Sequence, residues 1–88
     1  MTKDEIRRGF LEELTRVAPD LDAEAIRGSD HLQDDLELDS MDILNLVIGL
    51  KARFGVTIPE ADYLRIATSD LAVTYIAERV AAGPPPPG

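Results

Sequence analysis

Apolar side chains recur at helical spacing from the start of the chain. The first of them are separated by four, four and three positions and so share one face: Ile6, Phe10, Leu14 and Val17. Thr2 and Glu5 have the order of a capping box at the start of this run, and Pro19 follows its last member. The pattern predicts a helix from Lys3 to Val17.

The segment between Pro19 and Asp39 lacks this periodicity and is rich in Asp and Gly. We predict a long loop there, interrupted only by a turn at Asp22 to Arg27. Its apolar residues are spread along its length: Leu21, Ile26, Leu32 and Leu36. Because loops of this length are uncommon in compact domains, we expect these residues to hold the loop across a helix face.

A second helix is predicted from Ser40 to Phe54. Asp39 suits its N-cap and Gly55 its C-terminal stop. At about 100° per residue, its larger apolar stripe forms the core side. The stripe consists of Ile43, Leu46, Val47, Leu50 and Phe54.

Met41, Leu44 and Ile48 fall roughly opposite that core stripe. Two interpretations are open. In one, the preceding loop folds over these three side chains and buries them. In the other, they form an exposed stripe for docking partner proteins, flanked by Asp42 and Asn45.

The remaining sequence predicts two further helices. Pro59 suits the first position of a short helix that ends near Ile66, because a missing N–H costs nothing there. Thr68 or Ser69 caps a last helix that runs to about Val80. Its inward-pointing residues are predicted to be Leu71, Ala72, Tyr75 and Ile76.

Together these segments predict an all-α fold. It is a small four-helix bundle with three longer helices, one short helix, and a long loop between the first and second helices. The 88 residues are 44% apolar and 5% aromatic, which suits packed helices around one core. We expect a domain over residues 1–82, followed by a flexible Pro-rich tail, GPPPPG, over residues 83–88.

The charge balance excludes one class of partner. Lys and Arg number 9 against 17 Asp and Glu, and the resulting formal net charge of −8 repels nucleic acid. The acidity either favours partners with basic patches or serves only solubility. No apolar run approaches the roughly 18 residues of a membrane span, and no signal-peptide pattern is present. The expectation is a soluble, cytoplasmic monomer.

The side chains offer little catalytic or metal chemistry. The chain has no cysteine, and with His31 as its only histidine it shows no zinc site and no catalytic triad. A calcium loop starting at Asp20 fails, because Ala25 stands where a glycine must turn the chain. His31 stands where that loop needs a chelating glutamate.

Ser40 begins the second helix between two aspartates, and helix capping alone would explain a serine there. The longer string LELDSMD, followed by ILNLVIGLKARFGVTIP, resembles the phosphopantetheine attachment region of acyl carrier proteins. IPEAD at Ile58 to Asp62 and TSDLAVTYI at Thr68 to Ile76 follow in the order and spacing of that family. The resemblance covers roughly Lys3 to Val80.

This resemblance implies a non-catalytic carrier. Ser40 would bear the 4'-phosphopantetheine arm of coenzyme A, whose thiol holds acyl groups as thioesters, and Asp39 would cap the helix and orient the modifying enzyme. The implied docking residues are Met41, Asp42, Leu44 and Ile48, and the implied acyl pocket contains Ile43, Leu50, Ile66 and Ala72. The implied partners are a phosphopantetheinyl transferase, an acyl-loading ligase or synthase, and acyltransferases of fatty acid, polyketide or related biosynthesis.

The sequence departs from carriers of primary fatty acid synthesis at several positions. Asn45, Lys51 and Arg53 stand where acidic residues are usual, and Glu37 and Leu38 replace a frequent Gly-Ala pair. These departures indicate a specialised stand-alone carrier for a dedicated acyl or aminoacyl pathway. The alternative is an unmodified helical scaffold that binds partners through the Met41, Leu44 and Ile48 stripe.

Overall fold

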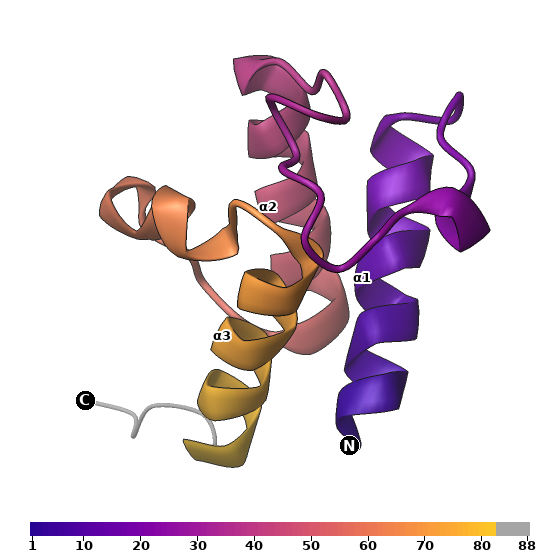
Figure 1. The fold of residues 1–88 in the computed structure, drawn as a ribbon. Coiled ribbons are helices and arrows are strands. Elements are labelled where there is room, and N and C mark those ends of the chain that lie inside the picture. The colour runs from indigo at the N-terminus through magenta and orange to yellow at the C-terminus, as the bar shows by residue number, and fades with distance from the viewer. Residues whose placement is uncertain (83–88) are drawn as a thin grey trace.

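The computed structural model describes residues 1–82, so the predicted tail over residues 83–88 lies outside the described part (Figure 1). The fold is all-helical, as predicted, with three α-helices and two 3₁₀ helices in the described residues. Their bounds are α1 Lys3–Val17, η1 Ala23–Ala25, α2 Ser40–Phe54, η2 Glu60–Ile66 and α3 Ser69–Ala82. None of these helices combines the length and the apolar character that crossing a membrane requires.

The ends of α1 and α2 agree with their sequence signals. At α1, the Glu5 N–H donates to Thr2 Oγ1 (3.1 Å) and the Thr2 N–H donates to Glu5 Oε1 (3.0 Å), which completes the capping box. The hydrogen bond from the Thr2 backbone lowers the pKa of Glu5, because it stabilises the ionised carboxylate. At the end of α2, Gly55 has a φ of 71° and donates its N–H to the Lys51 carbonyl.

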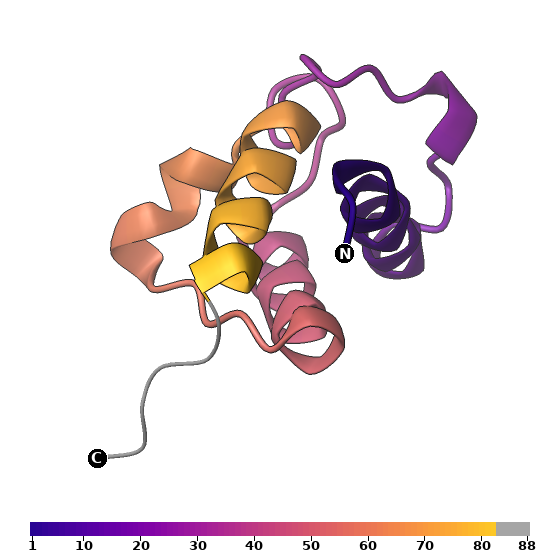
Figure 2. The ribbon, with the colours of Figure 1, turned by 90° about the horizontal axis from the view of Figure 1, so that it is seen from below.

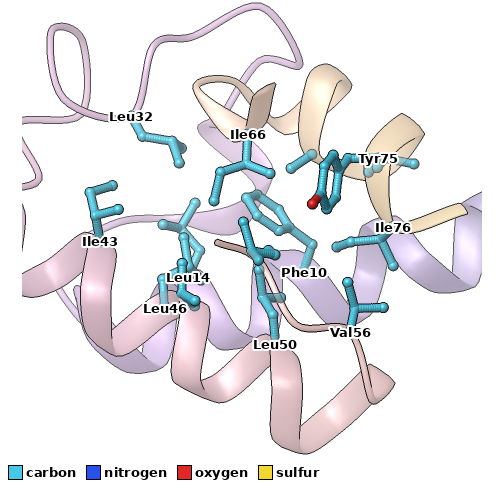
Figure 3. Close-up of a cluster of buried hydrophobic side chains, with 14 of the residues drawn as sticks. Phe10, Leu14, Leu32, Ile43, Leu46, Leu50, Val56, Ile66, Tyr75 and Ile76 are labelled. Carbon is cyan, nitrogen blue, oxygen red and sulfur yellow. The ribbon is translucent and has the colours of Figure 1, made fainter. Parts of the chain in front are cut away.

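The core lies where α1 packs against both α2 and α3, with η2 packed against α3. Figure 2 shows α1, α2 and α3 around a common centre, and η2 on the outer side of α3. Side chains from all of these elements point toward one another in Figure 3. The fully buried ones include Phe10, Leu14, Leu46, Leu50, Tyr75 and Ile76.

The long loop between α1 and α2 is attached to the junction of η2 and α3. The Leu32 N–H donates to the Ala67 carbonyl (2.9 Å), and the Asp70 N–H donates to the Gly28 carbonyl (3.0 Å). Leu32 is buried, and the other apolar residues of the loop pack against the core as predicted: Leu21, Ile26 and Leu36. The loop is held across the fold by these contacts and leaves the Met41, Leu44 and Ile48 stripe exposed.

Two details of the predicted helices were wrong. Pro59 is the N-cap of η2 and not its first helical residue, because the chain stays extended there (ψ 153°) while Val56 and Ile58 enter the core. Leu71 is 49% exposed and does not point inward. Val73 takes its place, since Ala72, Val73 and Ile76 share one face of α3 at 3.6 residues per turn and Leu71 falls outside it.

Candidate functional site

The first turn of α2 is capped by two aspartates. The Asp42 N–H donates to Asp39 Oδ1 (2.8 Å), and the Asp39 N–H donates to Asp42 Oδ2 (3.2 Å). Ser40 is exposed as the first residue of the helix, and its hydroxyl enters no hydrogen bond within residues 1–82. The capping function that could have explained a serine here therefore belongs to Asp39, and the Ser40 hydroxyl is left free for chemistry.

An exposed apolar stripe runs along α2 from the residue after Ser40. Met41 is 63% exposed, Leu44 42% and Ile48 58%. The residues of the opposite stripe are buried in the core: Ile43, Leu46, Val47 and Leu50. Of the two interpretations open from the sequence, burial of the stripe under the preceding loop is wrong, and the three side chains are accessible to a partner.

A cavity of about 180 Å³ opens beside Ser40. It lies between the start of α2, the long loop and η2, and its wall includes His31, Leu32, Ile43, Tyr63, Leu64 and Ile66. Two of the predicted pocket residues, Ile43 and Ile66, are thus brought together with Ser40. The other two, Leu50 and Ala72, are fully buried in the core and do not line this cavity.

Sequence reasoning did not find His31, Tyr63 and Leu64 as neighbours of Ser40. His31 was considered only as a metal or catalytic residue, and the structure instead places it in the cavity wall, with Nδ1 buried and without a hydrogen bond. Leu64 is 80% exposed. No periodicity in so short a segment indicates which side faces Ser40.

An ion cluster lies between α2 and α1. On the side facing α1, Arg53 donates to Glu12 Oε2 (2.5 Å), Glu13 Oε2 (3.1 Å) and the Gly9 carbonyl (3.1 Å). Glu13 is 5% exposed and also accepts from Arg16 Nη2 (2.7 Å). These acceptors hold the Arg53 guanidinium between α1 and α2, so its charge is paired within the fold.

The helices approach closely around this ion cluster. A Cβ atom added at Gly49 would lie 2.5 Å from Glu13 Oε1, and one added at Gly9 would lie 2.7 Å from Phe54 Cζ. Both glycines therefore allow α1 and α2 to pack at the distance that brings Glu13 and Arg53 together. The cluster joins α1 to the C-terminal end of α2.

Comparison with known proteins agrees with this geometry. The family model described as a phosphopantetheine attachment site matches residues 8–76. The chain is 30% identical over 82 residues to the acyl carrier protein of Rubrobacter xylanophilus, covering 93% of this chain and 100% of that protein. The chain belongs to the acyl carrier protein family.

Further comparisons extend over most of this carrier. It is 32% identical over 75 residues to the acyl carrier protein of Kocuria rhizophila, covering 85% of this chain and 91% of that protein. Among solved structures, the acyl carrier protein of Enterococcus faecalis matches with a TM-score of 0.69 and 28% identity, covering 89% of this chain and 98% of that chain. The similarity therefore includes the fold, the sequence and the length of the domain.

Membership defines the general role of the protein. It is a non-catalytic carrier, and its prosthetic group is covalently attached 4'-phosphopantetheine. The residues around Ser40 fit such a group. They provide an unengaged hydroxyl, the N-terminus of a fifteen-residue helix, and a cavity beside the hydroxyl.

Proposed function

We propose that Ser40 is the attachment point of the phosphopantetheine arm, and that residues 1–82 form the acyl carrier domain. The observation that supports this assignment is the free, exposed hydroxyl of Ser40 beside a cap built from Asp39 and Asp42. Ser29 is also exposed but lies in the long loop and not in the first turn of a helix, and Ser69 is 1% exposed. Ser40 is thus the serine best placed to be reached by a modifying enzyme.

The start of α2 is also a suitable environment for a phosphodiester. The first N–H groups of a helix have no intrahelical acceptor, and those of Ser40 and Met41 remain after the Asp39 cap has bound Asp42. These groups and the positive end of the helix dipole stabilise a nearby negative charge. When bound, the arm supplies the thiol that this cysteine-free chain lacks. Asp39 caps the start of the helix. The negative charges of Asp39 and Asp42 also help to orient the modifying enzyme.

The cavity beside Ser40 is proposed to bind the cargo, and the exposed stripe of α2 is proposed to bind partner enzymes. The cavity lined by Ile43, Tyr63 and Ile66 adjoins Ser40 and can receive the first part of an acyl group. Leu50 and Ala72 lie deeper in the core, and we propose that they contact cargo only when the helices move apart. Met41, Leu44, Ile48 and the half-buried Asp42 form the proposed docking residues.

We further propose that this is a specialised carrier that works as a monomer in the cytoplasm. Its partners would be a phosphopantetheinyl transferase, an acyl-loading ligase or synthase, and acyltransferases of a dedicated acyl or aminoacyl pathway. Support comes from Asn45 and Lys51, which give the exposed face of α2 a charge unlike that of carriers with an acidic second helix.

Mass spectrometry tests the attachment site. The purified chain is incubated with coenzyme A and a broad-specificity phosphopantetheinyl transferase, and its mass should rise by one arm. Ser40→Ala should gain none, while the matched control Ser29→Ala should gain one arm like the parent. An unchanged mass in the parent would contradict the proposal and leave the unmodified scaffold as the better description.

A further inference from the structure

The exposed face of α2 is ordered by charge along its length. The loop directly before its N-terminal end carries exposed carboxylates: Asp34, Asp35, Glu37 and Asp39. Its middle consists of exposed apolar and neutral side chains: Met41, Leu44, Asn45 and Ile48. Its C-terminal end carries the exposed Lys51. The face is therefore negative at one end, apolar in the middle and positive at the other end.

Lys51 lies on the same side of α2 as the docking stripe. It follows Ile48 by three positions and Leu44 by seven, a spacing that keeps all three side chains on one side of a helix. Within residues 1–82, Lys51 forms none of the ion pairs, whereas Arg53 is bound by Glu12 and Glu13. Lys51 is thus the cation of α2 that an approaching protein encounters.

We propose that the enzymes that dock on this carrier present an acidic side chain to Lys51, an apolar recess to the stripe, and basic side chains to the carboxylates before Ser40. This inference rests on the proposed function, because it takes Ser40 as the residue that the enzyme must reach. Ser40 and Lys51 are eleven residues apart on one helix, and at 1.5 Å per residue the acidic group lies about 16 Å along the enzyme surface from that point.

Charge complementarity favours such a partner over others. An enzyme with cations along its whole docking surface would place one of them against Lys51, and like charges at an interface reduce both the association rate and the affinity. A second copy of the chain in antiparallel orientation would also match the charge order. However, a stripe of three partly exposed side chains is much smaller than the roughly 800 Å² per partner of a stable protein interface.

The test uses an acyltransferase that serves a carrier with an acidic second helix. The phosphopantetheine-loaded chain competes with that carrier, and its inhibition constant is measured. Lys51→Glu should lower the inhibition constant about fivefold at low salt, and the gain should largely disappear near about 0.5 M salt. Lys3→Glu is the matched control, because it changes the net charge equally on exposed α1 and should have no effect.

A charge swap on the enzyme completes the test. Each basic residue of the enzyme's docking surface is replaced in turn by Glu. One of these replacements, about 16 Å from the active-site entrance, should make the enzyme bind the parent chain more tightly. The same replacement should make the enzyme bind the Lys51→Glu variant more weakly. The proposal is overturned if Lys51→Glu leaves the inhibition constant unchanged, or if Lys3→Glu lowers it equally. It is also overturned if sedimentation shows a dimer that Lys51→Glu dissociates. Failure of the arm to attach would instead count against the proposed function.

Discussion

Leu44 and Leu46 lie two positions apart on α2 and face in different directions, so their alanine variants separate docking from folding. Leu46 is 0% exposed, and truncation of a fully buried leucine leaves a cavity that costs about 3 kcal/mol. Leu44 is 42% exposed, so its truncation removes roughly half the burial of a leucine side chain, about 1 kcal/mol. The better helix propensity of alanine offsets a few tenths of a kcal/mol of that loss.

Two assays compare these variants. Urea unfolding followed by circular dichroism should show a much lower midpoint for Leu46→Ala and a fall only about a quarter as large for Leu44→Ala, at equal slope. Attachment of the arm by a phosphopantetheinyl transferase should show the reverse order, with kcat/KM for Leu44→Ala reduced about tenfold, as for the loss of a central interface contact. Leu46→Ala is assayed well below its own unfolding transition.

Either of two results would refute this reasoning. If Leu44→Ala unfolds at as low a urea concentration as Leu46→Ala, the stripe contributes to the core despite its exposure. If Leu44→Ala is loaded at the parental rate, and Met41→Ala and Ile48→Ala are as well, the stripe is exposed but does not contact the transferase.

Three further predictions concern single side chains. Arg53→Ala leaves buried Glu13 with one cationic partner and should destabilise the fold by about 2 kcal/mol in urea unfolding; an unchanged midpoint would contradict a stabilising ion cluster. Glu37 has a φ of 61°, so Glu37→Val should cost about 1 kcal/mol while Glu37→Gly costs nothing, and equal losses would show that strain is not the cause. Burial, and then the hydrogen bond to Asp62, raise the pKa of Tyr75 above its ordinary value of 10.0. Its contribution to stability is therefore complete below pH 10.0 and is lost as the pH rises through the higher folded-state pKa, so the stability of Tyr75→Phe should fall less steeply in that range.

The helices that the sequence predicted correctly have local signals at both ends. The capping box at Thr2, the cap at Asp39 and the left-handed Gly55 each depend on residues within one turn of the helix end. The exposed hydroxyl of Ser40 follows from the same local geometry. For these features, knowledge of neighbouring residues is sufficient.

The features that the sequence did not reveal depend on contacts between distant segments. The side of α3 that faces inward is set by α1 and η2, so the prediction for Leu71 was wrong although its helix was right. Tyr63 reaches the cavity only because η2 is packed against α3. The partners of Arg53 lie on another helix, and no spacing along α2 indicates them.

The contact between Gly49 and Glu13 has a consequence for the evolution of such carriers. A Cβ atom at position 49 would lie 2.5 Å from Glu13 Oε1 and would force this carboxylate to shift. Loss of the carboxylate would leave Arg53 with the Gly9 carbonyl and the more exposed Glu12. The three residues are therefore expected to be inherited or replaced as a group. An arginine at this point of the second helix should predict a glycine four positions earlier and a glutamate on the first helix, and it should not be counted among the charges that distinguish one carrier's enzymes from another's.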